Sequence, residues 1–434
     1  MSQLLSLIKN KKSIIGVVGL GYVGIPLSVR FLQEGYHVRG FDIDKKKIDK
    51  LSKGESFIKH ISSTDIAPFV GDKSFQVSTD FSGIGNCDVI ILCVPTPLTV
   101  HKEPDLSYIV SSCKACLPYL KKDQAFILES TTYPGTTDEV LKPMIEEKGF
   151  TVGKDIFLIF SPEREDPGRK DHSTRTIPKV VGGVTEACLE VGVAVYSLII
   201  DKVVKVSSAR AAEMTKLLEN IHRAVNIGLV NEMKIVCDKM GIDIHEVIDA
   251  AATKPFGFVA YRPGPGLGGH CIPIDPFYLT WKAKEYDLHT RFIELAGEVN
   301  SNMPDFVLSK LTAGLNTHKK ACNGSKVAVL GLAYKKNIDD ARESPSLPII
   351  QKLQQMGVDV TYVDPYVNPS ILEDHGILGT KRSELNKELL SQMDCVLIAT
   401  DHDCFDYEMI ISHSKLVVDT RGRYRQNKAN LIKA

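Results

Sequence analysis

The sequence lacks an excess of charge of either sign. Its 434 residues include 53 lysines and arginines against 53 aspartates and glutamates. This balance gives no electrostatic basis for binding nucleic acid or an anionic membrane, because both depend on a basic excess. A small anionic ligand remains compatible with the composition, because it needs only a local basic cluster. We therefore expect neither a nucleic-acid partner nor a membrane partner.

The sequence also lacks a disulfide framework and an uninterrupted apolar run of membrane-spanning length. Its ten cysteines are scattered, which in a chain of this length is typical of reduced thiols in the cytoplasm. Lys11 and Lys12 precede an apolar run from Ile14 to Val29 that resembles a signal peptide. Glycines and Pro26 interrupt this run where a strand-turn-helix needs them, so we expect a soluble, cytoplasmic protein.

A weak internal repeat predicts the fold class. In both copies an acid ends the second strand, seven residues after a glycine: Asp42 follows Gly35, and Asp364 follows Gly357. Strands that alternate with helices favour parallel sheets covered on both faces. We predict an α/β chain with two doubly wound, Rossmann-like domains, one at each end. The copies comprise the strand ending at 19, then 35–42 and 88–96, and later 327–335, 357–364 and 395–400.

A long helix is predicted between the two sheets. Ser207 and Ser208 can cap it, apolar residues recur at helical spacing, and the pattern stops near Gly241. A helix of about thirty residues exceeds most helices of globular proteins. We expect it to join the domains within a helical middle segment. Its apolar stripe (Met214, Leu218, Ile221 and Val225) predicts a homodimer or a multiple of one.

The first glycine turn predicts a dinucleotide site. Gly19 allows a tight turn, Gly21 lets the backbone approach a pyrophosphate, and Gly24 allows close helix-strand packing. Asp42 follows Gly24 by eighteen residues, near the offset of a carboxylate that binds ribose hydroxyls. A carboxylate there repels a 2′-phosphate, so the pattern favours NAD over NADP.

The second copy lacks the triple glycine. It has only Gly331, followed by a charged loop that contains Lys335, Asp340 and Arg342. A second dinucleotide is therefore not expected. Basic residues at the end of a parallel strand suit a phosphorylated ligand, and a solvated charged loop is an equally good interpretation of this segment.

A single thiol, Cys271, lies in the glycine-rich stretch 264–275. Glycine lets backbone approach a ligand, and a thiol held there can attack a carbonyl. For the adjacent His270 we favour a structural role, because neighbours in an extended loop point apart. Asp275 could hold a water or a lysine. A lysine is available at Lys216 on the long helix, one face of which carries Glu213, Lys216 and Asn220.

Two further polar loops follow apolar strands, at 130–132 and 161–168, where this architecture binds ligands. His402 and Cys404, with the neighbouring Asp401 and Asp403, resemble metal ligands. Since no second cluster completes such a site, we predict no metal.

Together these motifs resemble the UDP-glucose/GDP-mannose dehydrogenase family. The resemblance covers nearly the whole chain and is highly specific. It implies NAD-dependent enzymes that oxidise a sugar nucleotide twice at C6, giving a uronic acid for polysaccharide synthesis. The motifs are Gly19-x-Gly21-x-x-Gly24, Pro95-Thr96-Pro97, Ser130-Thr131, Pro162-Glu163, Ala212-Glu213-x-x-Lys216-x-x-x-Asn220, Gly268-Gly269-x-Cys271-x-x-x-Asp275 and Asp340-x-Arg342-x-Ser344.

The resemblance also implies roles for individual residues. Lys216 and Asp275, with a water, would assist proton removal, and Cys271 would form a thiohemiacetal and then a thioester. Glu163, with Thr131 placing water, would support hydrolysis, while Lys216 and Asn220 would hold the oxyanion. The cofactor would contact Gly19, Gly21, Tyr22, Val23, Gly24, Asp42, Thr96, Thr131 and Arg342. The substrate would contact Glu163, Lys216, Asn220, Lys254, Arg262, Gly268, Lys335 and Arg421.

The form of the thiol loop is similar to the branch that acts on UDP-N-acetylglucosamine. UDP-glucose members carry a lysine just before the aspartate, whereas this chain has Ile274. UDP-N-acetylmannosamine, UDP-N-acetylgalactosamine and UDP-glucose stay open as alternative substrates. Either Glu165 or Asp166 could replace the family's second acid. A single-hydride dehydrogenase and a non-catalytic nucleotide sensor are competing interpretations. The expected domains are 1–205 for NAD, 206–310 for dimerisation and the thiol loop, and 311–434 for the UDP-sugar.

Overall fold

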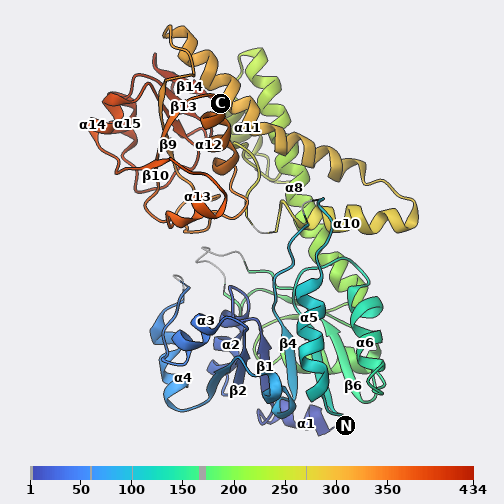
Figure 1. Cartoon of the computed structure of the whole chain (residues 1–434). Coiled ribbons are helices and arrows are strands. Elements are labelled where there is room, and N and C mark those ends of the chain that lie inside the picture. The colour runs from blue at the N-terminus through green and yellow to red at the C-terminus, as the bar shows by residue number, and fades with distance from the viewer. Residues whose placement is uncertain (1–2, 59–60, 100, 166–172, 270) are drawn as a thin grey trace. The chain divides into compact units, whose positions relative to one another are not determined.

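The computed structural model describes residues 3–58, 61–99, 101–165, 173–269 and 271–434. The chain forms two compact units (Figure 1). The first comprises Met1–Glu219 and Trp281–Leu288, and the second comprises Asn220–Thr280 and His289–Ala434. Across these described residues, no helix combines the length and apolarity that a bilayer crossing requires.

The first unit is built on an eight-stranded sheet with the strand order β3-β2-β1-β4-β5-β6-β7-β8. The strands from β3 to β6 are parallel, β7 runs antiparallel to β6, and β8 runs parallel to β7. Strands β4, β5 and β6 are buried along their whole length, as expected of a sheet covered on both faces. The strands are β1 (Ile14–Val18), β2 (His37–Phe41), β3 (Phe75–Ser78), β4 (Val89–Leu92), β5 (Gln124–Leu128), β6 (Ile156–Phe160), β7 (Lys179–Gly183) and β8 (Val203–Lys205).

Helices cover this sheet. Helix α2 packs on β1 and β2 (Figure 1). Helix α7 packs on β5, β6 and β7. Apolar side chains between these layers form one continuous core. The helices are α1 (Gln3–Lys9), α2 (Gly24–Gln33), α3 (Lys45–Leu51), α4 (Ala67–Gly71), α5 (Ser107–Cys116), α6 (Lys142–Glu146) and α7 (Glu186–Tyr196).

The second unit carries a six-stranded parallel sheet in the order β11-β10-β9-β12-β13-β14. This order repeats the first six strands of the other sheet, so the predicted pair of doubly wound sheets is confirmed. The strands are β9 (Lys326–Leu330), β10 (Asp359–Val363), β11 (Lys381–Arg382), β12 (Cys395–Ile398), β13 (Val417–Asp419) and β14 (Leu431–Lys433). The helices are α9 (Ile244–Ala251), α10 (Asp275–Ala283), α11 (Arg291–Thr317), α12 (Ser346–Gln355), α13 (Ser370–Asp374), α14 (Lys387–Gln392) and α15 (Tyr407–His413).

The predicted long helix is α8, which spans Ala209–Met240. The Ser208 hydroxyl accepts the Ala211 N–H at 3.2 Å, and Gly241 ends the helix with a positive φ of 71°. The predicted apolar stripe needs a correction, because Ile221 is buried and Val225 is half-buried within the chain. The exposed apolar stripe of α8 consists instead of Met214, Leu218, Leu229, Met233, Val236 and Met240.

Candidate active site

The first glycine turn has the shape of a phosphate-binding loop. Gly19 has a φ of +91°, and a Cβ there would lie 2.5 Å from the Cys93 carbonyl oxygen. A Cβ on Gly24 would lie 2.0 Å from the Gly19 carbonyl oxygen. On Gly21, by contrast, a Cβ would meet no heavy atom of the described residues within 4 Å. Gly19 and Gly24 are therefore fixed by packing, whereas Gly21 borders open space that suits a dinucleotide.

The surroundings of this turn also fit NAD. Helix α2 begins beside the turn, and Val23, which precedes it, has no side-chain oxygen to cap the first-turn N–H groups. Tyr22 is exposed and Asp42 is buried. The Asp42 carboxylate accepts the N–H of Leu20 through Oδ2 and the N–H of Asp44 through Oδ1, both at 2.9 Å. Each oxygen keeps acceptor capacity, which ribose hydroxyls can use.

The predicted residues of the first unit follow neighbouring strands. Asp42 follows β2, the glycine turn follows β1, and Thr96, Thr131 and Glu163 follow β4, β5 and β6. These strands are adjacent and parallel, so all five positions lie at the same edge of the sheet. Ligands bind at this carboxyl edge in doubly wound sheets.

Glu163 is held by several donors. Its Oε1 accepts the backbone N–H groups of Arg164 at 2.6 Å and Glu165 at 2.7 Å, and Lys179 Nζ lies 3.2 Å from its Oε2. Burial by itself raises the pKa of Glu163. The charge of Lys179 and the two backbone donors outweigh burial, so the pKa lies below its ordinary value. Glu163 is therefore a carboxylate at neutral pH.

The sequence reasoning did not identify the partners of Glu163. Lys179 Nζ also lies 2.9 Å from Oε2 of Glu129, and the hydroxyl of Tyr196 donates to Oε1 of Glu129. All three side chains are buried. One available signal was a lysine at the start of an apolar strand, where a charged side chain requires a partner.

Glu165 and Asp166 are the two candidates for the family's second acid. The carboxylate of Glu165 accepts a hydrogen bond from the hydroxyl of Thr174. Burial, and next the charge of Glu163, raises the pKa of Glu165. Asp166 lies outside the described residues.

Glu213, Lys216 and Asn220 lie along α8, and all three are buried, so this is not a solvated face. The Glu213 carboxylate accepts the N–H of Gly135 at 2.6 Å, and the N–H and hydroxyl of Thr137 at 2.9 and 2.7 Å. Burial raises its pKa to about 7, against the effect of these bonds. Glu213 thus fixes α8, and with it Lys216, to the loop that follows Thr131.

In the second unit, Asn220 and Asp275 are brought together. The Nδ2 of Asn220 donates to Oδ2 of Asp275 at 2.5 Å. The carbonyl of Cys271 accepts the N–H of Asp275 at 2.8 Å, in the turn that precedes α10. Cys271 is half-buried. Its backbone is anchored to Asp275, and the side chain of Asp275 accepts the hydrogen bond from Asn220. His270, the alternative base, lies outside the described residues.

Close packing explains the glycines of the thiol loop. A Cβ on Gly264 would lie 2.7 Å from an Arg421 guanidinium nitrogen, and one on Gly268 would lie 2.4 Å from Tyr334 Cβ. The N–H of Gly269 donates to the Arg342 carbonyl at 3.0 Å. The thiol loop thus packs on the loop that follows β9, which also contains Lys335.

The acid of the second copy has a different role from Asp42. Asp364 accepts the N–H groups of Leu332 and Ala333 through Oδ2, and those of Tyr366 and Val367 through Oδ1. The buried His402 also contacts Oδ2, through Nε2 at 3.1 Å. Burial raises the pKa of Asp364, but His402 and the backbone donors lower it to about 2. Asp364 therefore braces its own loop, which fits the expectation that this copy holds no dinucleotide.

The remaining predicted contacts lie in the same unit. Arg342 donates to both oxygens of Asp340. Arg421 donates through Nε to the Ala399 carbonyl at 2.7 Å. Lys254 and Arg262 are exposed, and Arg262 forms an ion pair with Asp249.

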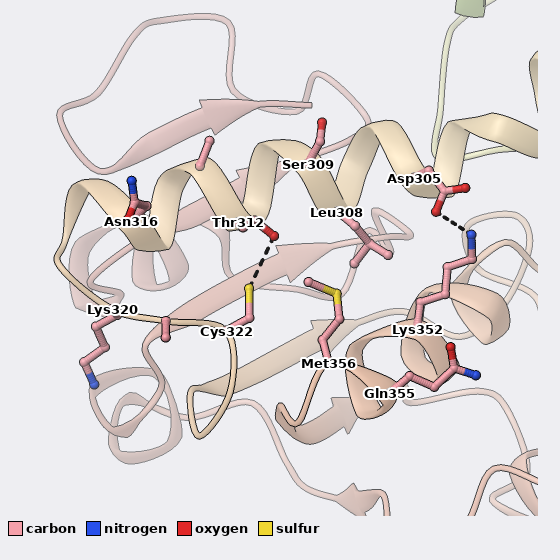
Figure 2. A pocket seen from close by; sticks show the side chains of 12 residues that line it. Asp305, Leu308, Ser309, Thr312, Asn316, Lys320, Cys322, Lys352, Gln355 and Met356 are labelled. Carbon is pink, nitrogen blue, oxygen red and sulfur yellow. Dashed lines mark hydrogen bonds and ion pairs between the residues drawn. The ribbon is translucent and has the colours of Figure 1, made fainter.

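A pocket of about 780 Å³ lies elsewhere in the second unit, beside α11 and α12 (Figure 2). Thr312 and Cys322 contact each other at its wall at 3.3 Å, and Asp305 pairs with Lys352. The described residues that line this pocket include none of the predicted site residues.

Known proteins match this chain over most of its length. The UDP-glucose/GDP-mannose dehydrogenase family matches through its NAD binding domain at residues 13–200, its central domain at 210–302 and its UDP binding domain at 328–426. The chain belongs to this family. It is an NAD-dependent nucleotide-sugar dehydrogenase, as the motifs predicted.

Individual relatives differ in their named substrates. The UDP-N-acetyl-D-glucosamine 6-dehydrogenase of Pseudomonas aeruginosa is 36% identical over 366 residues, covering 84% of this chain and 85% of the relative. The NDP-N-acetyl-D-galactosaminuronic acid dehydrogenase of Ralstonia nicotianae is 33% identical, with 94% and 96% covered. The solved structure of a UDP-D-ManNAc dehydrogenase from Pyrococcus horikoshii has a TM-score of 0.87 at 29% identity, with 96% and 98% covered.

Proposed function

We propose that this protein oxidises C6 of a UDP-N-acetylhexosamine in two steps, giving the uronic acid. The observation that carries the proposal is the fixed Cys271 loop. The backbone N–H of Asp275 donates to the Cys271 carbonyl, and the carboxylate of Asp275 accepts a hydrogen bond from the side-chain amide of Asn220. The thiol can add to a carbonyl carbon as a nucleophile, and the carboxylate and the amide can bind a water or an oxyanion beside it.

In this proposal the residues act at successive stages of the reaction. NAD supplies the hydride acceptor for both oxidations. Lys216 and Asp275, with a water, assist loss of the C6 hydroxyl proton, and Lys216 and Asn220 stabilise the oxyanion. Cys271 adds to the aldehyde as a thiohemiacetal and then carries the acyl group as a thioester. Glu163 assists hydrolysis, with Thr131 placing the water.

The other assigned contacts are also proposals. Gly19, Gly21, Gly24 and Asp42 bind the cofactor together with Tyr22, Val23, Thr96, Thr131 and Arg342. Lys335 and Arg421 bind the UDP-sugar, and Lys254, Arg262 and Gly268 line the sugar side. The division at residues 205 and 310 and the location in the cytoplasm likewise stay predictions.

UDP-N-acetylglucosamine is the first candidate substrate. The form of the thiol loop at 264–275 and the relative at 36% identity favour it. UDP-N-acetylmannosamine is the second candidate, favoured by the structural likeness at a TM-score of 0.87. The two sugars differ only in configuration at C2, so an acetamido pocket is compatible with either.

A substrate panel tests the proposal. The protein is mixed with NAD and each UDP-sugar, and reduced cofactor is measured by absorbance together with the product by mass. We expect two reduced cofactors per sugar with one UDP-N-acetylhexosamine, and far less turnover with UDP-glucose. One reduced cofactor per sugar would indicate a simple dehydrogenase, and no signal with any sugar would indicate a sensor.

Asp42→Ala should weaken the preference for NAD. The substitution removes the carboxylate that binds ribose and repels a 2′-phosphate. Losing these hydrogen bonds costs about 1–3 kcal/mol, so kcat/KM with NAD should fall roughly fivefold to 150-fold. The value with NADP should change less. Asp44→Ala is the matched control, because it removes an acid two residues away whose side chain caps α3. Equal kcat/KM with the two cofactors in the unmodified protein would refute this role of Asp42.

We also propose that a second copy of the chain covers the exposed apolar stripe of α8. Leu229→Glu should shift the protein toward monomer, because it buries a charge in an apolar contact. Sedimentation at micromolar concentration measures the change. Gln392→Glu adds the same charge at an exposed position of α14 and should leave assembly unchanged. Monomer alone in the unmodified protein would contradict the prediction.

A further inference from the structure

We propose that Lys179 is a positioning residue for the hydrolytic half of the reaction, acting through Glu163. The inference rests on the proposed function, because it assigns Glu163 to thioester hydrolysis. That step consumes one water: its oxygen joins the acyl carbon, the carbon–sulfur bond breaks with its electron pair on the Cys271 sulfur, which leaves as the thiolate, and a proton leaves the water. We assign that proton to Glu163.

The fold explains how Lys179 reaches Glu163. Strand β7 runs antiparallel to β6, with Phe160 opposite Gly182. The first residue of β7 therefore lies at the edge where β6 ends, and this is the edge that carries Glu163. From there Lys179 Nζ lies 3.2 Å from Oε2 of Glu163 and 2.9 Å from Oε2 of Glu129. A lysine on a parallel strand in this place would start at the opposite edge.

The surroundings hold Lys179 in one position. It is 4% exposed, and its ammonium also lies 5.3 Å from the ring centroid of Tyr196. Tyr196 is fully buried and donates its hydroxyl to Glu129. Burial raises the pKa of Glu129 and of Tyr196. Burial lowers the pKa of Lys179, but the two carboxylates outweigh it and raise the pKa above its ordinary value, so Lys179 stays charged.

Other ionisable groups face Glu163 from the remaining elements. Lys216 on α8 adds a smaller charge effect that favours the carboxylate, and Glu165 in the same loop has a raised pKa. Cys93, after β4, has a thiol whose pKa burial raises well above the ordinary value. Arg164 is paired with Glu219. Among the described residues, Lys179 is therefore the cation in direct contact with the Glu163 carboxylate.

The direction of the effect follows from this arrangement. Burial raises the pKa of Glu163, and Lys179 is the largest opposing influence. Without Lys179, burial dominates and the pKa of Glu163 rises. Glu163 then becomes protonated at a higher pH than in the unmodified protein. An opposite charge at hydrogen-bond distance favours the ionised form of a carboxyl group and so lowers its pKa. A protonated Glu163 cannot take a proton from water, so the acyl-enzyme should persist.

The test compares pH profiles of the two half-reactions. Lys179→Met should move the acid limb of uronate formation upward by at least about one pH unit, with thioester accumulating on Cys271 by intact mass. The rate of the first hydride transfer should change little. Lys179→Met alone leaves the Glu129 carboxyl buried without its lysine. The double variant Glu129→Gln/Lys179→Met removes that unpaired group and should show the same shift of the acid limb. Lys179→Arg keeps the charge and should restore the limb.

Two controls separate this inference from its alternatives. Lys205→Met makes the same substitution at an exposed position of the neighbouring strand β8 and should leave the profile unchanged. An unshifted acid limb in both methionine variants, with no thioester, would overturn the role of Lys179. If both methionine variants fail to fold, Lys179→Arg decides: a profile like that of the unmodified protein supports the role, and a shifted one opposes it. Hydrolysis unaffected by Glu163→Gln would instead overturn the assignment of Glu163.

Discussion

Cys271→Ala should produce no uronic acid and at most traces of reduced cofactor. The first hydride transfer turns an alcohol into an aldehyde, and an aldehyde has no hydride to give until a nucleophile adds. The thiol supplies that adduct and retains the intermediate. Without it the second oxidation stops, and product measured by mass should fall below detection over many turnovers of the unmodified protein.

Binding of NAD should survive the same substitution. The glycine turn and Asp42 belong to the first unit, whereas Cys271 lies in the second. A calorimetric titration with NAD should therefore match that of the unmodified protein. Cys404→Ala is the matched control, because it removes an exposed thiol from the same unit and should keep full activity.

Cys271→Ser should distinguish the nucleophile from the shape of the loop. A hydroxyl is nearly isosteric with the thiol, but it is scarcely ionised at neutral pH and attacks far more slowly. Any adduct that forms would become an ester that hydrolyses slowly and adds the mass of the sugar to the protein. Near-normal uronate formation by Cys271→Ala, with two reduced cofactors per sugar, would leave the cysteine structural.

Local patterns were sufficient to predict the framework. The order of the elements follows from the two glycine-and-acid repeats, because each repeat is one strand-helix-strand unit read over a short window. The helix from Ala209 to Met240 follows from its serine cap and terminal glycine in the same way. The family, the NAD cofactor and the fold class predicted from these patterns are confirmed.

Contacts between distant residues could not be predicted in this way. Lys179 reaches Glu163 only because β7 reverses direction, and nothing in its own sequence window specifies that reversal. Glu213 binds Thr137, which precedes it by 76 residues. In both cases the partner lies too far away in the sequence for a local pattern to identify it.

Similar sequence patterns can also hide opposite roles. Asp42 and Asp364 end equivalent strands, seven residues after a glycine. Asp364 is surrounded by four backbone donors and His402, whereas Asp42 accepts two backbone bonds and retains acceptor capacity. The difference lies in two further backbone donors and in His402, which is 38 residues from Asp364.

Alanine at Gly24 and alanine at Gly21 should have different effects on the glycine turn, one mainly on stability and the other mainly on NAD binding. At Gly24 an added Cβ would lie 2.0 Å from the Gly19 carbonyl oxygen, so backbone must move. Gly24→Ala should lower the free energy of unfolding by about 1–3 kcal/mol, measured by urea denaturation. NAD binding should weaken as a consequence of the displaced turn.

At Gly21 the added methyl group meets no described atom within 4 Å. Gly21→Ala should therefore leave the free energy of unfolding unchanged or slightly higher, since alanine restricts the unfolded chain. The methyl group would instead occupy the space that the pyrophosphate needs, so the backbone could not approach it. Losing one or two phosphate hydrogen bonds costs about 1–3 kcal/mol, or roughly fivefold to 150-fold in the Kd for NAD. Calorimetric titration measures that Kd on protein whose stability is checked in parallel. A Gly21→Ala variant that binds NAD with unchanged affinity would show that the open space beside this glycine does not receive the cofactor phosphates.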